Sequence, residues 1–461
     1  MTLPYWLPDA VFYQIFPDRF ANGDPRNDPP NVAPWGSQPT IWNFMGGDLR
    51  GILQHLDYLL DLGVNALYLN PIFHATSNHR YNTTDYYRID PKLGTLADFH
   101  ALLEACHANG IRVVLDGVFN HTGRGFFAFN DILENGEHSP YKDWYIIHRL
   151  PLQAYGEGKA EDYEAWWGFR SLPKLNVANP QVREFVFGVA RYWLEQGIDG
   201  WRLDVPNEID DDAFWQEFRQ VVKTTNPDAC LVGEIWTADA RWVQHFDGLM
   251  HYPLREAILG FVDGSLAASA FASRLQEFLA LYGEHAKGMY LPLGSHDTER
   301  LMTVLGGDEE KVRLALGLQF AYLGAPAVYY GDEVGLEGGK DPDNRRAFPW
   351  DETQWRQGVR RWVQRLIAAR RRTPALRRGG FRLVEAKDGR QCVAFGRVLG
   401  AEAVLVVANA SPVKRHCHLT VAALGWEDGR IVHDLLGHGE GVVAGDTLHW
   451  DILPHQVVWL V

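Results

Sequence analysis

Three carboxylic acids stand at intervals along the chain, each just after a run of apolar residues that could form a buried strand. Asp204 closes the run 200–205, Glu234 follows in G-E-I-W, and Asp297 follows in G-S-H-D. Residues two apart on a strand share a face, so Arg202 can hold Asp204 ionised. Two carboxyl groups, one nucleophilic and one acidic, are what covalent glycoside cleavage requires. For Arg202 and Asp204 alone, a structural ion pair explains the pattern equally well.

The elements that would position these acids follow a repeating strand–helix order. Helical apolar spacing occurs at 49–62, 95–108, 180–194, 214–222, 266–282 and 359–372. The strand candidates are 11–16, 64–69, 111–116, 200–205, 231–235, 248–252, 289–294 and 326–330. Eight strand–helix units in one chain predict a (β/α)8 TIM barrel, an α/β fold whose functional side chains gather at the carboxyl ends of the strands.

Two stretches depart from this order. Residues 119–173 are rich in Gly, Asn, His and aromatics, and they predict an inserted domain after the third strand. Beyond residue 376 the pattern changes to short alternating runs, which predict a C-terminal antiparallel β-sandwich. The expected organisation is therefore a barrel in two parts, 1–118 and 174–376, an insertion at 119–173 and a sandwich at 377–461.

Composition narrows the class of ligand. The net charge is -14 and no Lys/Arg-rich run occurs, which argues against nucleic acid or an anionic membrane surface. No apolar stretch reaches membrane-spanning length. The 17 Trp, 18 Tyr and 23 Phe residues suit the apolar faces of a neutral sugar. Four widely spaced cysteines and the absence of a signal-peptide pattern lead us to expect a cytoplasmic protein with reduced thiols.

The barrel hypothesis predicts that further polar side chains join the acids at one rim. Tyr81 lies after the second strand, His121 after the third and His296 after the seventh. The two histidines could hold sugar hydroxyls, and Tyr81 could offer a stacking face. Each of them alone could equally be an ordinary loop residue or helix cap.

Four segments together resemble a known family. D-G-V-F-N-H at 116–121, G-W-R-L-D-V-P-N-E at 200–208, G-E-I-W at 233–236 and G-S-H-D at 294–297 are similar to the conserved segments of the α-amylase family, glycoside hydrolase family 13. The resemblance implies a retaining α-glucan hydrolase with a covalent glycosyl-enzyme intermediate, a domain B at the insertion and a domain C at the end. It implies Asp204 as nucleophile, Glu234 as general acid/base and Asp297 as the carboxylate that stabilises the transition state. It also implies that four further residues surround the cleaved bond: Arg202, His121, His296 and Tyr81.

A shorter segment indicates the subgroup. L-P-K-L-N at 172–176 is similar to M-P-K-L-N in the neopullulanase, cyclomaltodextrinase and maltogenic amylase subgroup, and Trp236 after the acid also fits that subgroup. The implied reaction is cleavage of α-1,4 bonds in cyclodextrins, maltooligosaccharides, starch or pullulan, with possible transglycosylation. Asp341 and Arg345 match positions that contact the next sugar on the non-reducing side, although a plain loop salt bridge explains them equally well.

Two other functions remain open at this point. An exo-acting α-glucosidase or glucosyl-transferring isomerase of the same family would typically carry Q-P-D-L-N in place of L-P-K-L-N. A non-catalytic, amylase-like binding protein would lose the carboxylates that this chain retains.

A cluster of oxygen-bearing residues near the N-terminus could hold calcium. The subgroup carries a similar arrangement as a Ca²⁺ site, and without that likeness the cluster would read as an ordinary loop. The candidate ligands are Asn22, Asp24, Asn27, Asp28, Gly47 and Asp48. We expect structural calcium and no organic cofactor.

The position of the first strand bears on assembly. It begins by residue 11, which leaves no room for the β-rich N-terminal domain that builds a dimer in the subgroup. We therefore expect a monomer, or an oligomer built differently, with α-glucan as the partner and neither nucleic acid nor membrane.

Overall fold

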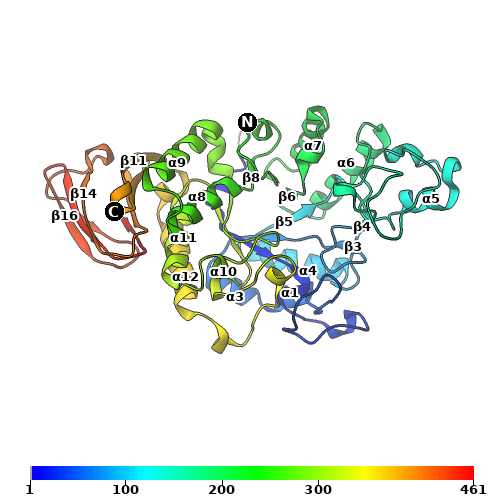
Figure 1. The fold of residues 1–461 in the computed structure, drawn as a ribbon, viewed down its shortest axis with the longest axis horizontal. Coiled ribbons are helices and arrows are strands. Elements are labelled where there is room, and N and C mark those ends of the chain that lie inside the picture. Colours follow the sequence, from blue (N-terminus) through cyan, green and yellow to red (C-terminus); the bar gives the residue numbers. More distant parts are fainter. Residues whose placement is uncertain (1–2) are drawn as a thin grey trace.

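The computed structural model describes residues 3–461 and consists of three parts (Figure 1). A barrel occupies the middle, the insertion after the third barrel strand protrudes at the right, and a β domain lies at the left. In residues 3–461, no helix is long and apolar enough to cross a bilayer.

The barrel is a sheet of eight parallel strands in the order β8-β7-β6-β5-β2-β1-β10-β9. A single bridge between Met250 and Tyr290 joins the two edges, so the barrel is nearly closed. Every strand is buried along almost its whole length, which explains the continuous apolar runs in the sequence. This confirms the predicted TIM barrel. The strands are β1 Phe12–Ile15, β2 Ala66–Leu69, β5 Arg112–Gly117, β6 Gly200–Leu203, β7 Cys230–Gly233, β8 Gly248–Leu249, β9 Tyr290–Pro292 and β10 Ala325–Tyr329.

Helices connect most successive strands, and some of them begin at side-chain caps. Asn179 accepts a hydrogen bond from the backbone N–H of Gln181, with Pro180 at the first helical position. Thr95 and Asp98 form a reciprocal capping box. The helices of the barrel are α1 Pro17–Phe20, α2 Leu49–Gln54, α3 Leu56–Leu62, α4 Leu96–Ala108, α6 Pro180–Glu195, α7 Asp212–Thr225, α8 Tyr252–Asp263, α9 Ala268–Tyr282, α10 Leu301–Val304, α11 Glu309–Ala321, α12 Gln357–Arg372 and α13 Pro374–Arg378.

One expected helix is broken. The apolar spacing at 49–62 predicts a continuous helix, but α2 and α3 meet at His55, whose φ and ψ are -104° and 21°. The His55 ring stacks on Trp350 with centroids 3.5 Å apart and planes at 17°. The break between the two helices thus coincides with a contact to a residue far along the chain.

The insertion is anchored beside a small antiparallel sheet of β3 (Phe73–Ala75) and β4 (Thr83–Ile89). It contains α5 (Phe127–Asn135), short 3-10 helices and isolated β-bridges. The backbone N–H of Gly123 donates to Thr83 O at 2.7 Å, and the Tyr86 hydroxyl donates to the His121 carbonyl at 2.9 Å. These bonds hold the turn before β4, which carries Tyr81, against the start of the insertion.

The C-terminal domain consists of two four-stranded antiparallel sheets, ordered β11-β12-β13-β18 and β14-β17-β16-β15. Apolar side chains from both sheets, among them Leu405 and Leu419, share one core. The predicted antiparallel domain is therefore confirmed. The alternating runs at 392–395, 403–408, 416–421, 430–434, 447–452 and 456–461 correspond to six of its strands, and the sequence did not predict the other two, β11 and β16. The strands are β11 Gly380–Lys387, β12 Cys392–Leu399, β13 Glu402–Asn409, β14 Arg415–Thr420, β15 Ile431–His433, β16 Glu440–Ala444, β17 Thr447–Ile452 and β18 Gln456–Leu460.

Candidate active site

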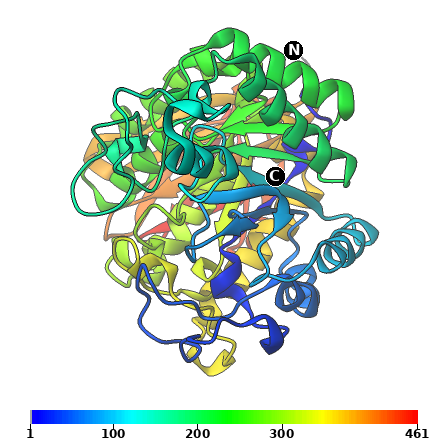
Figure 2. The same cartoon turned by 90° about the vertical axis from the view of Figure 1, so that its right-hand side faces the viewer.

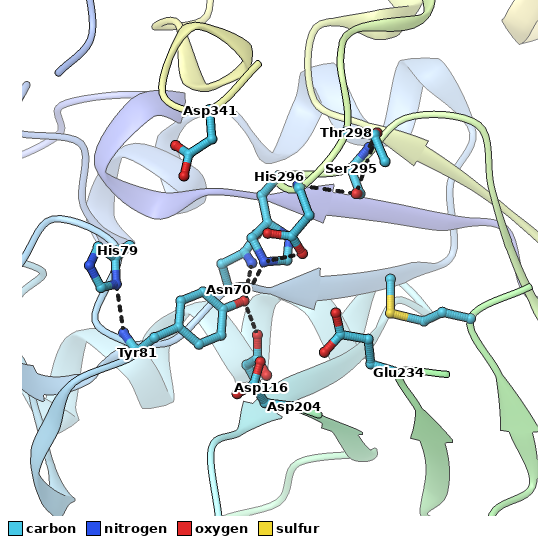
Figure 3. A network of polar contacts seen from close by, with 12 residues as sticks. Asn70, His79, Tyr81, Asp116, Asp204, Glu234, Ser295, His296, Thr298 and Asp341 are labelled. Carbon is cyan, nitrogen blue, oxygen red and sulfur yellow. Dashed lines mark hydrogen bonds and ion pairs between the residues drawn. The ribbon is translucent and has the colours of Figure 1, made fainter. Parts of the chain in front are cut away.

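Arg202 lies at the centre of a carboxylate cluster at the carboxyl ends of β5, β6 and β7. The Nη1 atom contacts Asp116 Oδ1 at 2.8 Å and Asp204 Oδ1 at 3.0 Å. The Nη2 atom lies 2.8 Å from Glu234 Oε2, as an ion pair without hydrogen-bond alignment. Figure 3 shows the three carboxylates pointing into the same space. One buried cation therefore holds the predicted nucleophile and the predicted acid side by side.

The environment of Asp204 makes its ionisation depend on this arginine. Burial raises the pKa of Asp204 well above its ordinary value, the guanidinium of Arg202 opposes this rise, and the charges of Glu234 and Asp116 add to it. A carboxyl group must be ionised to act as a nucleophile. The contact with Arg202 therefore favours the ionised form of Asp204, which its predicted role needs.

Glu234 is held through both of its oxygens. The indole Nε1–H of Trp236 donates to Oε1 at 3.0 Å, and the backbone N–H of Val205 donates to Oε2 at 2.9 Å. Trp236 is kept in place by Tyr252, whose ring is stacked 3.7 Å away at 2°. Val205 has φ 37° and ψ 51°, a left-handed conformation that costs a β-branched residue about 1–3 kcal/mol. This strained backbone turns the N–H of Val205 toward the carboxylate of Glu234.

Asp297 faces the cluster from the loop after β9. Its Oδ2 lies 3.0 Å from Nε2 of His296, and its Oδ1 lies 3.5 Å from Nη2 of Arg345. The side chain is 30% exposed. Desolvation by the surrounding groups raises the pKa of Asp297 to about 7, with the charge of Glu234 adding to the rise and Arg345 opposing it.

His296 is a neutral hydrogen-bonding group. Burial, followed by the charges of Arg202 and Arg345, lowers its pKa well below the ordinary value. Gln14 Nε2 lies 2.9 Å from Nδ1, so Nδ1 accepts and the proton is assigned to Nε2. The Nε2–H group can then donate toward Asp297 or the Tyr81 hydroxyl.

Tyr81 packs against His296 and bonds to the carboxylate cluster. Its ring is parallel to the imidazole at 8° with centroids 5.4 Å apart. Its hydroxyl donates to Asp116 Oδ2 at 2.8 Å and receives a bond from Asn70 at 3.0 Å. Tyr68 also donates to Asp116 Oδ2, at 2.6 Å. Asp116 thus accepts from two phenols as well as from Arg202.

His121 lies at the junction with the insertion. Burial lowers its pKa to about 3, so it is neutral, and its ring stacks on Trp166 with centroids 5.6 Å apart. Its Nε2 is buried and has no hydrogen-bond partner within residues 3–461. An imidazole nitrogen of this kind is free to bind a hydroxyl group of a ligand.

Asp341 and Arg345 form the loop salt bridge that the sequence allowed, at 3.1 Å. Arg345 also reaches Asp297, and the Asp341 carboxylate remains 45% exposed. The pair therefore lies beside the predicted catalytic carboxylates, and the carboxylate of Asp341 remains partly accessible to solvent.

The candidate calcium ligands are only partly brought together. The Asn22 amide contacts Asp28 Oδ1 at 2.9 Å, and the Asn27 amide contacts Asp48 Oδ2 at 3.0 Å. The Oδ1 atoms of both asparagines are buried and lack partners among the described residues, which leaves two oxygens suited to a cation. Asp24 instead faces two arginines, Arg26 at 2.7 Å and Arg50 at 3.2 Å.

The remaining members of that set act as supports. Asp48 caps α2 by accepting from Gly51 N–H and also accepts from the N–H of Gly23. Gly47 is packed against the backbone of Pro17, with no room for a side chain. Within residues 3–461, no three His, Cys, Asp or Glu side chains converge as a metal site. Asn22 and Asn27 each keep an unpartnered oxygen that a cation could use, while the Asn22 amide nitrogen faces Asp28.

Sequence reasoning did not assign roles to several residues of this site. Asp116, Tyr68 and Gln14 position the catalytic groups, and Val205 orients Glu234. A signal was present for Gln14 and Asp116, because polar residues inside otherwise apolar parallel strands are costly unless they have partners. No comparable signal marks Val205, since nothing in its type indicates a positive φ.

Known proteins resemble the chain along nearly its full length. A family model described as "Alpha amylase, catalytic domain" matches residues 14–381. Neopullulanase 2 from Thermoactinomyces vulgaris is 45% identical over 448 residues, which cover 95% of this chain and 76% of that protein. A cyclomaltodextrinase from a Bacillus species is 47% identical over 412 residues, which cover 88% of this chain and 73% of that protein. The solved structure of a cyclic α-maltosyl-(1→6)-maltose hydrolase from Arthrobacter globiformis, in complex with that compound, is 43% identical with a TM-score of 0.90 and full coverage of both chains. The chain belongs to the α-amylase family, glycoside hydrolase family 13, and is an α-glucan hydrolase of that family.

Proposed function

We propose that the protein cleaves α-1,4-glucosidic bonds inside α-glucans with retention of configuration, through a covalent intermediate on Asp204. The observation that carries this proposal is that Arg202 contacts both Asp204, at 3.0 Å, and Glu234, at 2.8 Å. It holds a nucleophile and an acid against one space, as a retaining glycosidase requires.

The proposed steps follow from the contacts of each group. Asp204 attacks the anomeric carbon while Glu234 donates a proton to the departing glycosidic oxygen. Water, activated by Glu234 as a base, then releases the sugar from Asp204. Asp297 and His296 bind hydroxyls of the sugar as it flattens toward the oxocarbenium-like transition state, and the Nε2 atom of His121 binds another.

The substrates are proposed to be cyclodextrins, maltooligosaccharides, starch or pullulan. The segment L-P-K-L-N and the names of the relatives, neopullulanase and cyclomaltodextrinase, support this class. A sugar hydroxyl could replace water in the second step and give transglycosylation. An exo-acting α-glucosidase or glucosyl-transferring isomerase is the alternative within the family.

Calcium, assembly and location are further parts of the proposal. Ca²⁺ bound by Asn22, Asn27 and Asp28 would neutralise carboxylate charge and brace the loop before α2. Burial raises the pKa of Asp28, which is consistent with a carboxylate that lacks a cationic partner. We further propose that the protein is a monomer and that it lies in the cytoplasm. The four buried free thiols support the proposed location.

Product analysis tests the proposed activity. The protein is incubated with β-cyclodextrin, soluble starch, pullulan and maltotriose, and the products are separated by chromatography. Proton NMR during the first minutes identifies the anomer released, with Asp204→Asn as the inactive control. An initial α-anomer is expected. A β-anomer, or full activity in Asp204→Asn, would refute the mechanism, and release of glucose alone from chain ends would support the exo-acting alternative.

A further inference from the structure

A large aromatic side chain stands almost fully in solvent near the site. Trp42 is 80% exposed, and its neighbour Ile41 is also exposed. Both lie in the segment between α1 and α2. Tryptophan offers a large flat apolar surface, so an exposed indole on a fixed support is suited to binding a ligand.

Hydrogen bonds fix the backbone beneath this indole. Thr40 Oγ1 accepts from the N–H groups of Trp42 at 3.2 Å and Asn43 at 3.0 Å. Asn43 Oδ1 accepts in return from Thr40 N–H at 2.8 Å. From the neighbouring loop, Asn78 Nδ2 donates to the carbonyls of Thr40 at 3.1 Å and Asn43 at 2.8 Å. Stacking of a ligand on Trp42 would therefore cost little conformational entropy, because the loop is already ordered.

The braced loop adjoins the loop that reaches the catalytic carboxylates. Gln38 Nε2 donates to Asp343 Oδ1 at 2.8 Å. Asp343 lies in the same turn as Asp341 and Arg345, and Arg345 contacts Asp297. In Figures 1 and 2 the dark-blue segment before α2 and the yellow segment after β10 lie side by side at the bottom, away from the teal insertion.

The other side of the braced loop also leads to the site. Asn78 is followed by His79, whose Nδ1 accepts from the N–H of Tyr81 at 3.1 Å. Trp42 is thus tied through one neighbour to the Asp341 loop and through another to the Tyr81 loop. Both connections place it along the same stretch of the barrel rim.

We propose that Trp42 is an outer glucose-binding platform, used by glucan chains that extend beyond the sugar beside Asp341 and Arg345. The apolar face of a glucose ring would stack on the indole, while the exposed Asp341 carboxylate would accept bonds from hydroxyls of the preceding sugar. The platform contributes only when the substrate is long enough to reach it. This inference rests on the proposed α-glucan hydrolase activity.

The test compares a short and a long substrate in Trp42→Ala, Trp42→Phe and a control. The control is Tyr5→Ala, which removes an aromatic side chain of similar exposure, 77%, that packs beneath Arg378 of α13. For Trp42→Ala we expect kcat/KM on maltoheptaose to fall about three- to ten-fold, as the loss of one aromatic contact implies. We expect kcat/KM on maltotriose to stay within about two-fold, Trp42→Phe to recover most of the loss, and Tyr5→Ala to match the unmodified protein on both substrates.

An equal fall in kcat/KM of Trp42→Ala on both substrates, or no fall on maltoheptaose, would overturn the proposal that Trp42 is a glucose-binding platform. A change in sedimentation coefficient in Trp42→Ala alone would overturn it as well, because it would assign the indole to contact with a second copy of the chain. Failure of the proposed function is distinguishable, because the unmodified protein would then not hydrolyse maltotriose at all.

Discussion

Replacement of Arg202 by Met should destabilise the protein and abolish its activity together. The guanidinium is buried and lies 2.8–3.0 Å from three carboxylates. Removing one partner of a buried ion pair costs about 3–5 kcal/mol, because the charge left behind has no compensation. The scaling known for smaller domains, extended to a chain of this length, gives a shift of roughly 1–2 °C per kcal/mol. The thermal midpoint of Arg202→Met should therefore fall by about 5 °C.

The direction of the pH dependence follows from the carboxyl groups that remain. Burial already raises the pKa of Asp204, and loss of Arg202 would raise it further. A carboxyl group with a raised pKa in the folded state binds more protons than in the unfolded state, so stability falls as pH rises above the unfolded value near 4. The destabilisation of Arg202→Met should therefore be larger at pH 8 than at pH 5.

Circular dichroism melts at pH 5 and pH 8, with hydrolysis of maltotriose in parallel, provide the assay. Arg202→Lys is the matched control, because it keeps the charge and loses the planar fork. It should recover part of the thermal stability but little of the activity. A midpoint of Arg202→Met within 1 °C of the unmodified protein at pH 8, or a loss of the same size at both pH values, would refute the reasoning.

Three further perturbations have distinct signatures. Desolvation raises the pKa of Asp297 to about 7, so its ionisation makes the folded protein less stable as the pH rises from about 4 to 7. Asp297→Asn should therefore be inactive, melt at a higher temperature than the unmodified protein at pH 8 and match it near pH 4. An equal midpoint at pH 8 would contradict this. Val205→Gly relieves about 1–3 kcal/mol of strain and adds about 1 kcal/mol of chain entropy cost, so its thermal midpoint should hold. The backbone N–H remains but is held less firmly toward Glu234, so kcat should fall; a midpoint several degrees lower with kcat intact would count against this. A chelator should lower the melting temperature and Ca²⁺ restore it, with no such response in Asn22→Ala; identical melts with chelator and with Ca²⁺ would remove calcium from the proposal.

Much of the barrel could be predicted because buried parallel strands leave a continuous apolar pattern in the sequence. The runs ending at Asp116, Asp204 and Glu234 are such strands, and their carboxyl ends meet at one rim in any barrel. Strand order and the approximate position of the acids therefore follow from the sequence. The helix cap at Asn179 is a local signal, because an Asn-Pro pair precedes an apolar helical pattern.

The features that escaped prediction depend on contacts between residues far apart in the chain. The break at His55 accompanies its stack on Trp350, and β11 and β16 pair with β12 and β17. The bond from Val205 to Glu234 depends on a backbone conformation that valine rarely adopts. The pKa of Asp297 depends on charges brought from other strands. None of these is encoded in a short window of sequence.

The seam of the barrel has a consequence for how the protein tolerates heat. Between β8 and β9, a single bridge joins Met250 to Tyr290, and Nε of Arg202 donates to the Met250 sulfur at 3.5 Å. Arg202 therefore contacts the part of the barrel that has the fewest bonds between neighbouring strands. Local opening there would remove this contact, while the ion pairs of Arg202 to Asp116, Asp204 and Glu234 on the paired strands persist. We expect activity to be lost at a lower temperature than the paired strands unfold, because opening at the seam disturbs the position of Arg202 first.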